Sequence, residues 1–179
     1  MAETASEMFG LRWGIKHSFV DYIRRMPDGQ GAVSNGARPV GDYEIVYAPE
    51  ATGHRPGPDG SSERFWLFNG DVRFAGHFGM LSVRIAYPRI VLSGDQAQLD
   101  IADPYSNDRE QRLFLATLTL TEVPAEDGVE RWVGSDVRLA AGGVELFNEV
   151  YPAGEKLEDL RIDVPLVTPE GQAGPIAAE

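Results

Sequence analysis

The spacing of apolar residues changes near residue 27, and this change restricts what the chain can fold into. Before residue 27, apolar side chains recur every three or four residues, at Leu11, Ile15, Phe19, Tyr22, Ile23 and Met26. This spacing predicts one amphipathic helix over 8–26. Pro27-Asp28-Gly29 is expected to end that helix. Beyond it the period becomes two, which predicts strands over 43–47, 64–68, 72–75, 81–87, 90–92, 98–102, 113–121, 130–139 and 160–164.

Short turns separate these strands and favour antiparallel pairing. They contain residues that tolerate positive φ, in Ser34-Asn35-Gly36, Asn69-Gly70-Asp71, Ser93-Gly94-Asp95 and Glu126-Asp127-Gly128. The Gly- and Pro-rich stretch 53–63 is expected to be an exposed loop, and the spacing over 141–148 permits a short helix. We therefore expect a mainly β fold: an antiparallel sheet or sandwich with an N-terminal α-helix packed over it and a short second helix near the C-terminus.

Length and charge narrow the class of protein further. The 179 residues suit one domain: an extension at 1–10, a single domain over 11–167 and a flexible tail at 168–179. The net charge of −12, with scattered acidic residues, argues against a nucleic-acid partner. The chain has no cysteine, which excludes disulfides, thiolate nucleophiles and Cys-ligated metals. It shows neither a leader nor an integral membrane segment, so we expect a cytoplasmic protein, or an extracellular or cell-surface one if a leader was removed.

Three segments carry a recognisable pattern. Residues 13–22 read W-G-x-K-x-S-F-x-x-Y, residues 74–81 read F-x-G-H-x-G-x-L, and residues 139–154 form a looser third segment. Together, and in this order over 11–164, they resemble the HtaA-type haem-binding domain of actinobacterial haem-uptake proteins. The resemblance implies that the cofactor is haem b in its ferric form.

The resemblance also implies a role for each matching residue. In the family the tyrosine that closes the first motif binds the haem iron, and here it is Tyr22. The serine four residues earlier, Ser18, would contact a haem propionate, and the histidine of the second motif, His77, would hydrogen-bond the tyrosine. Tyr151 is the matching aromatic residue of the third segment, which lines the haem and can contact a propionate.

The residue types suit this chemistry on physical grounds. Ser18 and Tyr22 are one helical turn apart and share a face. A phenol has a reference pKa of about 10, so it needs both Fe³⁺ and a proton acceptor to bind as phenolate, and His77 can be that acceptor. A hard anionic donor favours ferric iron. Taken singly, Tyr22 could instead be a core aromatic and His77 a hairpin-turn residue.

Three functions follow as hypotheses. The first is a haem carrier that transports, delivers or buffers haem. Such a carrier would exchange haem with a donor or acceptor protein and could form a homodimer. The second is a haem-dependent peroxidase or oxygenase, since catalase also uses a phenolate donor, but the sequence assigns no distal acid–base residue. The third is a β-sandwich interaction module that binds no haem and whose aromatic residues only build the core. The residue pattern favours the carrier.

Overall fold

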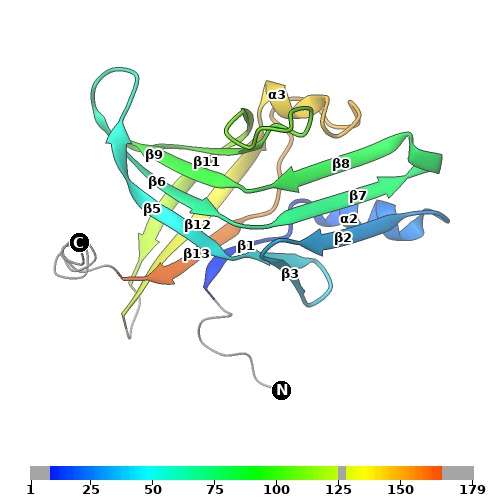
Figure 1. Ribbon diagram of the computed structural model, residues 1–179, viewed down its shortest axis with the longest axis horizontal. Coiled ribbons are helices and arrows are strands. Elements are labelled where there is room, and N and C mark those ends of the chain that lie inside the picture. Colours follow the sequence, from blue (N-terminus) through cyan, green and yellow to red (C-terminus); the bar gives the residue numbers. More distant parts are fainter. Residues whose placement is uncertain (1–8, 125–127, 167–179) are drawn as a thin grey trace.

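The protein is a bent, mainly antiparallel β structure, described by a computed structural model over residues 9–124 and 128–166 (Figure 1). Two sheets and two α-helices make up these residues. The mainly β fold expected from the period-two pattern is confirmed. The expected tail at 168–179 and most of the turn at 126–128 lie outside the described residues. No helix within the described part of the chain is long and apolar enough to cross a membrane.

The larger sheet has ten strands, each antiparallel to its neighbours. In spatial order they are β3 (Ala37–Val40), β4 (Glu44–Tyr47), β1 (Gly10–Trp13), β13 (Leu160–Pro165), β12 (Val129–Leu139), β11 (Arg112–Val123), β10 (Gln96–Ala102), β9 (Arg89–Ser93), β6 (Ser62–Phe68) and β5 (Pro49–Pro56). The sheet curls back on itself, because Trp66 of β6 meets Trp132 of β12 at a ring distance of 5.2 Å although three strands lie between them. An apolar core fills the space inside this curl.

The smaller sheet extends away from the curled body and carries the first helix (Figure 1). Its strand order is β2 (Gln30–Ser34), β7 (Asp71–Gly76) and β8 (Leu81–Ala86). Helix α2 (His17–Arg25) packs on it through Phe19, whose ring meets the edge of Phe74 at 5.2 Å. The expected packing of an N-terminal helix over a sheet is therefore present, on the smaller of the two sheets.

The first half of the predicted helix over 8–26 is wrong. Residues 10–13 form strand β1, which pairs with β13 on one side and β4 on the other. Leu11, Trp13 and Ile15 are fully buried, and Ile15 has a φ of 63° that interrupts any helix. The spacing of these three residues also fits period two, and two neighbouring strands from distant parts of the chain satisfy the backbone there. The helix therefore begins only at His17.

The stretch 53–63 is largely exposed, as predicted, but it is not a single loop, because its two ends belong to strands and only residues 57–61 connect them. Strands β5 and β6 form a hairpin in which Gly53 lies opposite Phe65 and Arg55 opposite Glu63. Glycine suits this place because a Cβ at position 53 would lie 3.2 Å from the Phe65 ring. The prolines stand at the two ends of β5, which is an edge strand and can lack backbone donors. Strands β2 and β3 were likewise missed.

The second helix is shorter than the pattern over 141–148 suggested. Helix α3 covers Ala141–Val144, and hydrogen-bonded turns continue the chain to Val150. These turns place Phe147 in the core, where its ring meets Phe19 of α2 edge-on at 5.2 Å. The C-terminal segment and the N-terminal helix are thus held side by side.

Candidate functional site

All four predicted site residues line one cleft. It has a volume of about 350 Å³ and lies between α2, the turn after β7 and the segment after α3. Ser18 and Tyr22 come from α2, His77 from the short 3-10 turn η1 (His77–Gly79), and Tyr151 from the C-terminal segment. The structure therefore brings together residues that are up to 133 positions apart in the sequence (18 to 151). Their contacts show how each is positioned.

Helix α2 presents different residues to the core and to the cleft. Phe19 is buried between Phe74 and Phe147 and fixes the helix in place. Ser18 is exposed, and Tyr22, one turn further on, keeps 38% of its surface exposed. Tyr22 is therefore not a core aromatic residue, although it falls within the apolar pattern of the sequence. Its hydroxyl is available to a ligand in the cleft.

Tyr22 and His77 are hydrogen-bonded to one another. The bond joins the Tyr22 hydroxyl to His77 Nε2, and the two ring centres lie 5.8 Å apart. An imidazole nitrogen at this place can accept the phenol proton, or donate to the oxygen once the proton has left. This geometry allows the pair to hold and move one proton at the Tyr22 oxygen.

The backbone around His77 is held by Asp28. His77 N–H donates to Asp28 Oδ1 at 3.2 Å and to Met26 Sδ at 3.2 Å, and Phe78 N–H donates to Asp28 Oδ2 at 2.6 Å. The hydrogen bond from Phe78 lowers the pKa of Asp28, so this carboxylate stays ionised. His77 and Phe78 both have left-handed backbone angles, with φ of 51° and 56°, and the Asp28 carboxylate holds that conformation. The sequence analysis missed Asp28 in this role, because it depends on a contact across about 50 residues.

Tyr151 lines the cleft, and a cation lies beside its ring. The Tyr151 ring packs edge-on against Phe147 at 5.7 Å, and Lys16 Nζ lies 5.2 Å from the centre of the same ring. Lys16 also pairs with Glu155 at 3.0 Å. The first motif contains Lys16, yet only the fold shows that it lies beside Tyr151.

Arg25 is a second cleft residue that sequence reasoning missed. It lines the cleft from the end of α2, three residues after Tyr22. Within residues 9–124 and 128–166 it has neither a carboxylate nor a hydrogen-bond partner. Its spacing of seven from Ser18 places it on the same helix face, which is the sequence signal that could have identified it.

The other two histidines lie away from this cleft. His17 is exposed and stacks on Tyr43 at a ring distance of 4.3 Å. His54 is exposed on β5, not in a loop. Neither lines the cleft that contains Tyr22.

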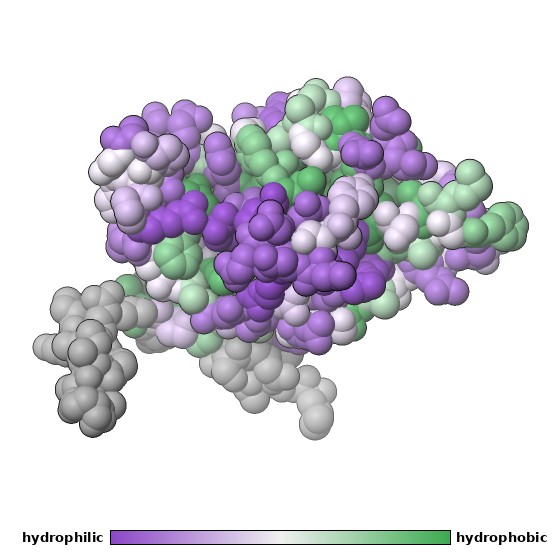
Figure 2. Space-filling model, turned by 45° about the horizontal axis from the view of Figure 1, so that its top comes forward, coloured by the Kyte–Doolittle hydropathy of each residue, from purple (hydrophilic) through white to green (hydrophobic). Residues whose placement is uncertain are grey.

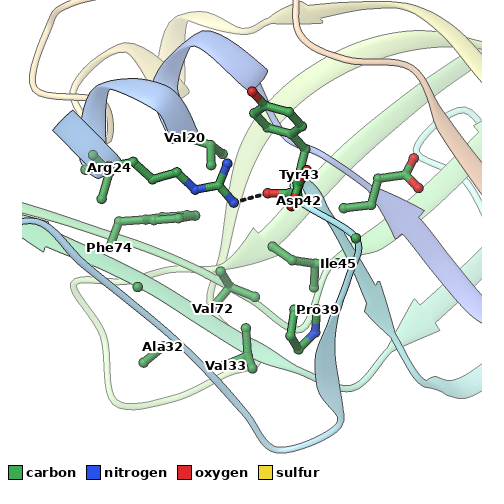
Figure 3. Close-up of a pocket in the computed structure, with 14 residues that line it drawn as sticks. Val20, Arg24, Ala32, Val33, Pro39, Asp42, Tyr43, Ile45, Val72 and Phe74 are labelled. Carbon is green, nitrogen blue, oxygen red and sulfur yellow. Dashed lines mark hydrogen bonds between the residues drawn. The ribbon is translucent and has the colours of Figure 1, made fainter. Parts of the chain in front are cut away.

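A second cavity, of about 280 Å³, lies on the other side of α2 (Figure 3). Apolar side chains such as Ile45, Val72 and Phe74 line it, and Arg24 donates to the Asp42 carbonyl across one end (Figure 3). Its one phenol, Tyr43, donates to a carboxylate, Asp21, at 2.8 Å, and this bond raises the pKa of Tyr43. A phenol held in this way is a poor source of phenolate, so the chemistry favours the cleft at Tyr22.

The chain is thus a curled antiparallel β domain with a hydrogen-bonded tyrosine–histidine pair in an open cleft. The chain is a member of the HtaA family, whose family model, described as Htaa, matches residues 9–163. The match covers every element from β1 to β12, helix α3 and most of β13, so the cleft residues lie inside the family domain. The family expected from the three sequence segments is confirmed.

Solved structures share this fold. The C-terminal domain of HtaA from Corynebacterium glutamicum is 22% identical, with a TM-score of 0.69 over 87% of this chain and 94% of that one. The N-terminal domain of the same protein is 23% identical, with a TM-score of 0.66 over 88% and 96%. The haem binding protein HtaB of that organism is 17% identical, with a TM-score of 0.60 over 87% and 91%. At these identities the likeness establishes the fold, and no curated protein sequence matches the chain.

Proposed function

We propose that this protein binds ferric haem b through Tyr22 and carries it for transport, delivery or buffering. The observation that supports this most directly is the hydrogen-bonded Tyr22–His77 pair at the wall of an open cleft. Membership of the HtaA family and the structural likeness to HtaB, a haem binding protein, support the same ligand.

The residues of the cleft fit a flat, largely apolar ligand that has carboxylates at one edge. Leu81, Phe147 and Val150 supply apolar surface. Ser18 lines the cleft and Lys16 lies beside the ring of Tyr151, so a hydroxyl and an ammonium group could meet the propionates. Haem would supply a ferric ion, which attracts a hard anionic donor such as phenolate. Two phenols line the cleft, Tyr22 and Tyr151, and Tyr22 is the one whose oxygen is hydrogen-bonded to an imidazole, that of His77.

His77 gives Tyr22 the proton acceptor that it needs. A free phenol is almost wholly protonated at neutral pH, so phenolate binding requires that the proton be taken up or shared. His77 Nε2 is already in hydrogen-bond contact with the Tyr22 oxygen, and Asp28 fixes the backbone of His77. The chain therefore holds the donor oriented before any ligand arrives, which lowers the ordering cost of binding.

A carrier is supported better than a haem enzyme. Peroxide or oxygen chemistry needs an acid–base group free to act on the side of the iron away from the ligand. Among the described residues that line the cleft, the one imidazole belongs to His77, and Tyr22 already occupies it. A module that binds no haem would leave the exposed Tyr22–His77 pair without a use.

A hemin titration followed by absorption spectroscopy tests the proposal. We expect a one-to-one complex with the spectrum of a ferric tyrosinate, and at least an approximately 100-fold loss of affinity in Tyr22→Phe, because the donor atom itself is removed. Tyr43→Phe is the matched control, since it removes a phenol on the other side of α2 and should bind normally. Unchanged binding in Tyr22→Phe would exclude Tyr22 as the iron ligand. Peroxide turnover well above that of free hemin would favour the enzyme.

A further inference from the structure

The turn between β7 and β8 exposes two large apolar side chains at the end of the smaller sheet. Phe78 is 96% exposed and Met80 is 82% exposed, the highest values for large hydrophobic residues in the described chain. Residues 74–83 contain no Asp, Glu, Lys or Arg, although a quarter of the whole sequence is charged. The turn lies at the right-hand end of the molecule in Figure 1, where the chain between α2 and β2 also lies, and Figure 2 shows hydrophobic surface at that end. We call residues 77–80 the apolar tip.

The backbone of the apolar tip is fixed in a conformation that faces Phe78 outward. Phe78 has a φ of 56°, in a region that bulky side chains rarely adopt. Asp28 accepts the N–H groups of both His77 and Phe78 and so holds this arrangement. Backbone strain that the surroundings maintain commonly occurs at functional sites. The exposure of Phe78 therefore results from a defined, hydrogen-bonded turn.

One arginine lies near the apolar tip. Arg25 ends helix α2 and lines the cleft together with His77, and the following residue, Met26, contacts the His77 N–H. Arg25 forms no carboxylate pair within the described residues. Asp28, the acidic residue that contacts the tip, directs its carboxylate to the backbone N–H groups of His77 and Phe78. Apolar side chains beside cations suit the boundary between lipid hydrocarbon and phosphate headgroups.

We propose that the apolar tip inserts Phe78 and Met80 into the surface of a lipid bilayer. Two projecting side chains offer far less area than the roughly 1,000 Å² that a specific protein interface needs, whereas a bilayer requires no matching socket. His77 belongs both to the tip and to the cleft, so insertion brings the mouth of the cleft to the lipid surface. The purpose of this contact rests on the proposed function, since haem is largely apolar and enters lipid.

Fluorescence gives a direct measurement of insertion. In Phe78→Trp the new indole replaces an exposed aromatic side chain, and the three native tryptophans, Trp13, Trp66 and Trp132, are buried and should not respond to lipid. On addition of phosphatidylcholine vesicles, without haem, we expect a blue shift and stronger emission from the variant and no change in the wild type. Absence of any shift would overturn the proposal.

Vesicle flotation measures the same contact without a probe. Phe78→Asn combined with Met80→Ser should reduce the partition coefficient of the chain at least about tenfold, because two apolar side chains no longer enter the lipid. Asparagine is chosen because it tolerates positive φ. Tyr105→Ser, which removes an exposed aromatic residue elsewhere, should float like the wild type.

The hemin titration separates this proposal from the proposed function. Phe78 and Met80 do not line the cleft, so the double variant should bind hemin normally while losing its vesicle contact. If the wild-type protein binds hemin but does not float with vesicles, the lipid contact is refuted while the proposed haem binding stands. That result would favour a small pocket on a protein partner as the site that receives Phe78 and Met80. Equal flotation of the wild type and the double variant would equally refute the lipid contact.

Discussion

Phe19 is the side chain on which the geometry of the cleft depends, and its removal should be costly. It is 3% exposed and meets Phe74 and Phe147 edge-on at 5.2 Å each, so it joins α2 to the smaller sheet and to the C-terminal segment. Truncation of a buried phenylalanine to alanine costs about 3–5 kcal/mol. Phe19 borders the open cleft, where water and neighbouring groups can fill part of the space. We therefore expect about 3 kcal/mol for Phe19→Ala, at the lower end of that range.

Urea unfolding followed by circular dichroism measures this loss. With a slope of about 2 kcal/mol per M, a loss of 3 kcal/mol lowers the midpoint by about 1.5 M. Phe19→Leu keeps most of the volume and should cost only about 1 kcal/mol. Tyr105→Ala removes an exposed aromatic residue and should change stability by less than about 0.5 kcal/mol. A loss below about 1 kcal/mol for Phe19→Ala would refute the view that Phe19 holds the three segments together.

Three further predictions concern the smaller sheet and the cleft. Burial acts to raise the pKa of the Asp71 carboxyl, but hydrogen bonds from Arg73 and Arg84 outweigh burial and lower that pKa. The ionised carboxylate therefore stabilises the fold above the pKa of Asp71 in the unfolded chain, and this stabilisation is lost as pH falls through its pKa in the folded protein. Asp71→Asn should cost roughly 3 kcal/mol of stability at neutral pH, measured by thermal unfolding. A Cβ at Gly76 would lie 2.1 Å from Met26 Sδ, so Gly76→Ala should displace the His77 turn, cost about 1–3 kcal/mol and weaken hemin binding. Ser18→Ala should lower hemin affinity about fivefold in titration, with stability unchanged, because one hydrogen bond to the ligand is lost.

The sequence predicted helices and strands well where the spacing of apolar residues fits only one of the two. The strands over 64–68, 98–102 and 130–139 match β6, β10 and β12 closely, because alternation has a single reading there. The pattern failed between residues 8 and 15, where apolar spacings fit both a helix and a strand. The pairing of β1 with β13 and β4 decided between them. Those partners lie far away in the sequence, so no local pattern could reveal them.

The sequence by itself determined the class of fold, the family and the four residues expected at the cleft. Ser18 and Tyr22 could be placed on one face because a helix sets their spacing, and His77 and Tyr151 could be placed because their segments carry the family pattern. The tertiary structure decided that these four line one cleft, that Tyr22 stays half exposed, and that its oxygen meets His77 Nε2. It also decided the contacts of Asp28 with the His77 turn and of Lys16 with Tyr151, and the place of Arg25 at the cleft. Such contacts depend on how distant segments pack, and the free energy of packing is shared across the whole core, so short-range periodicity cannot encode them.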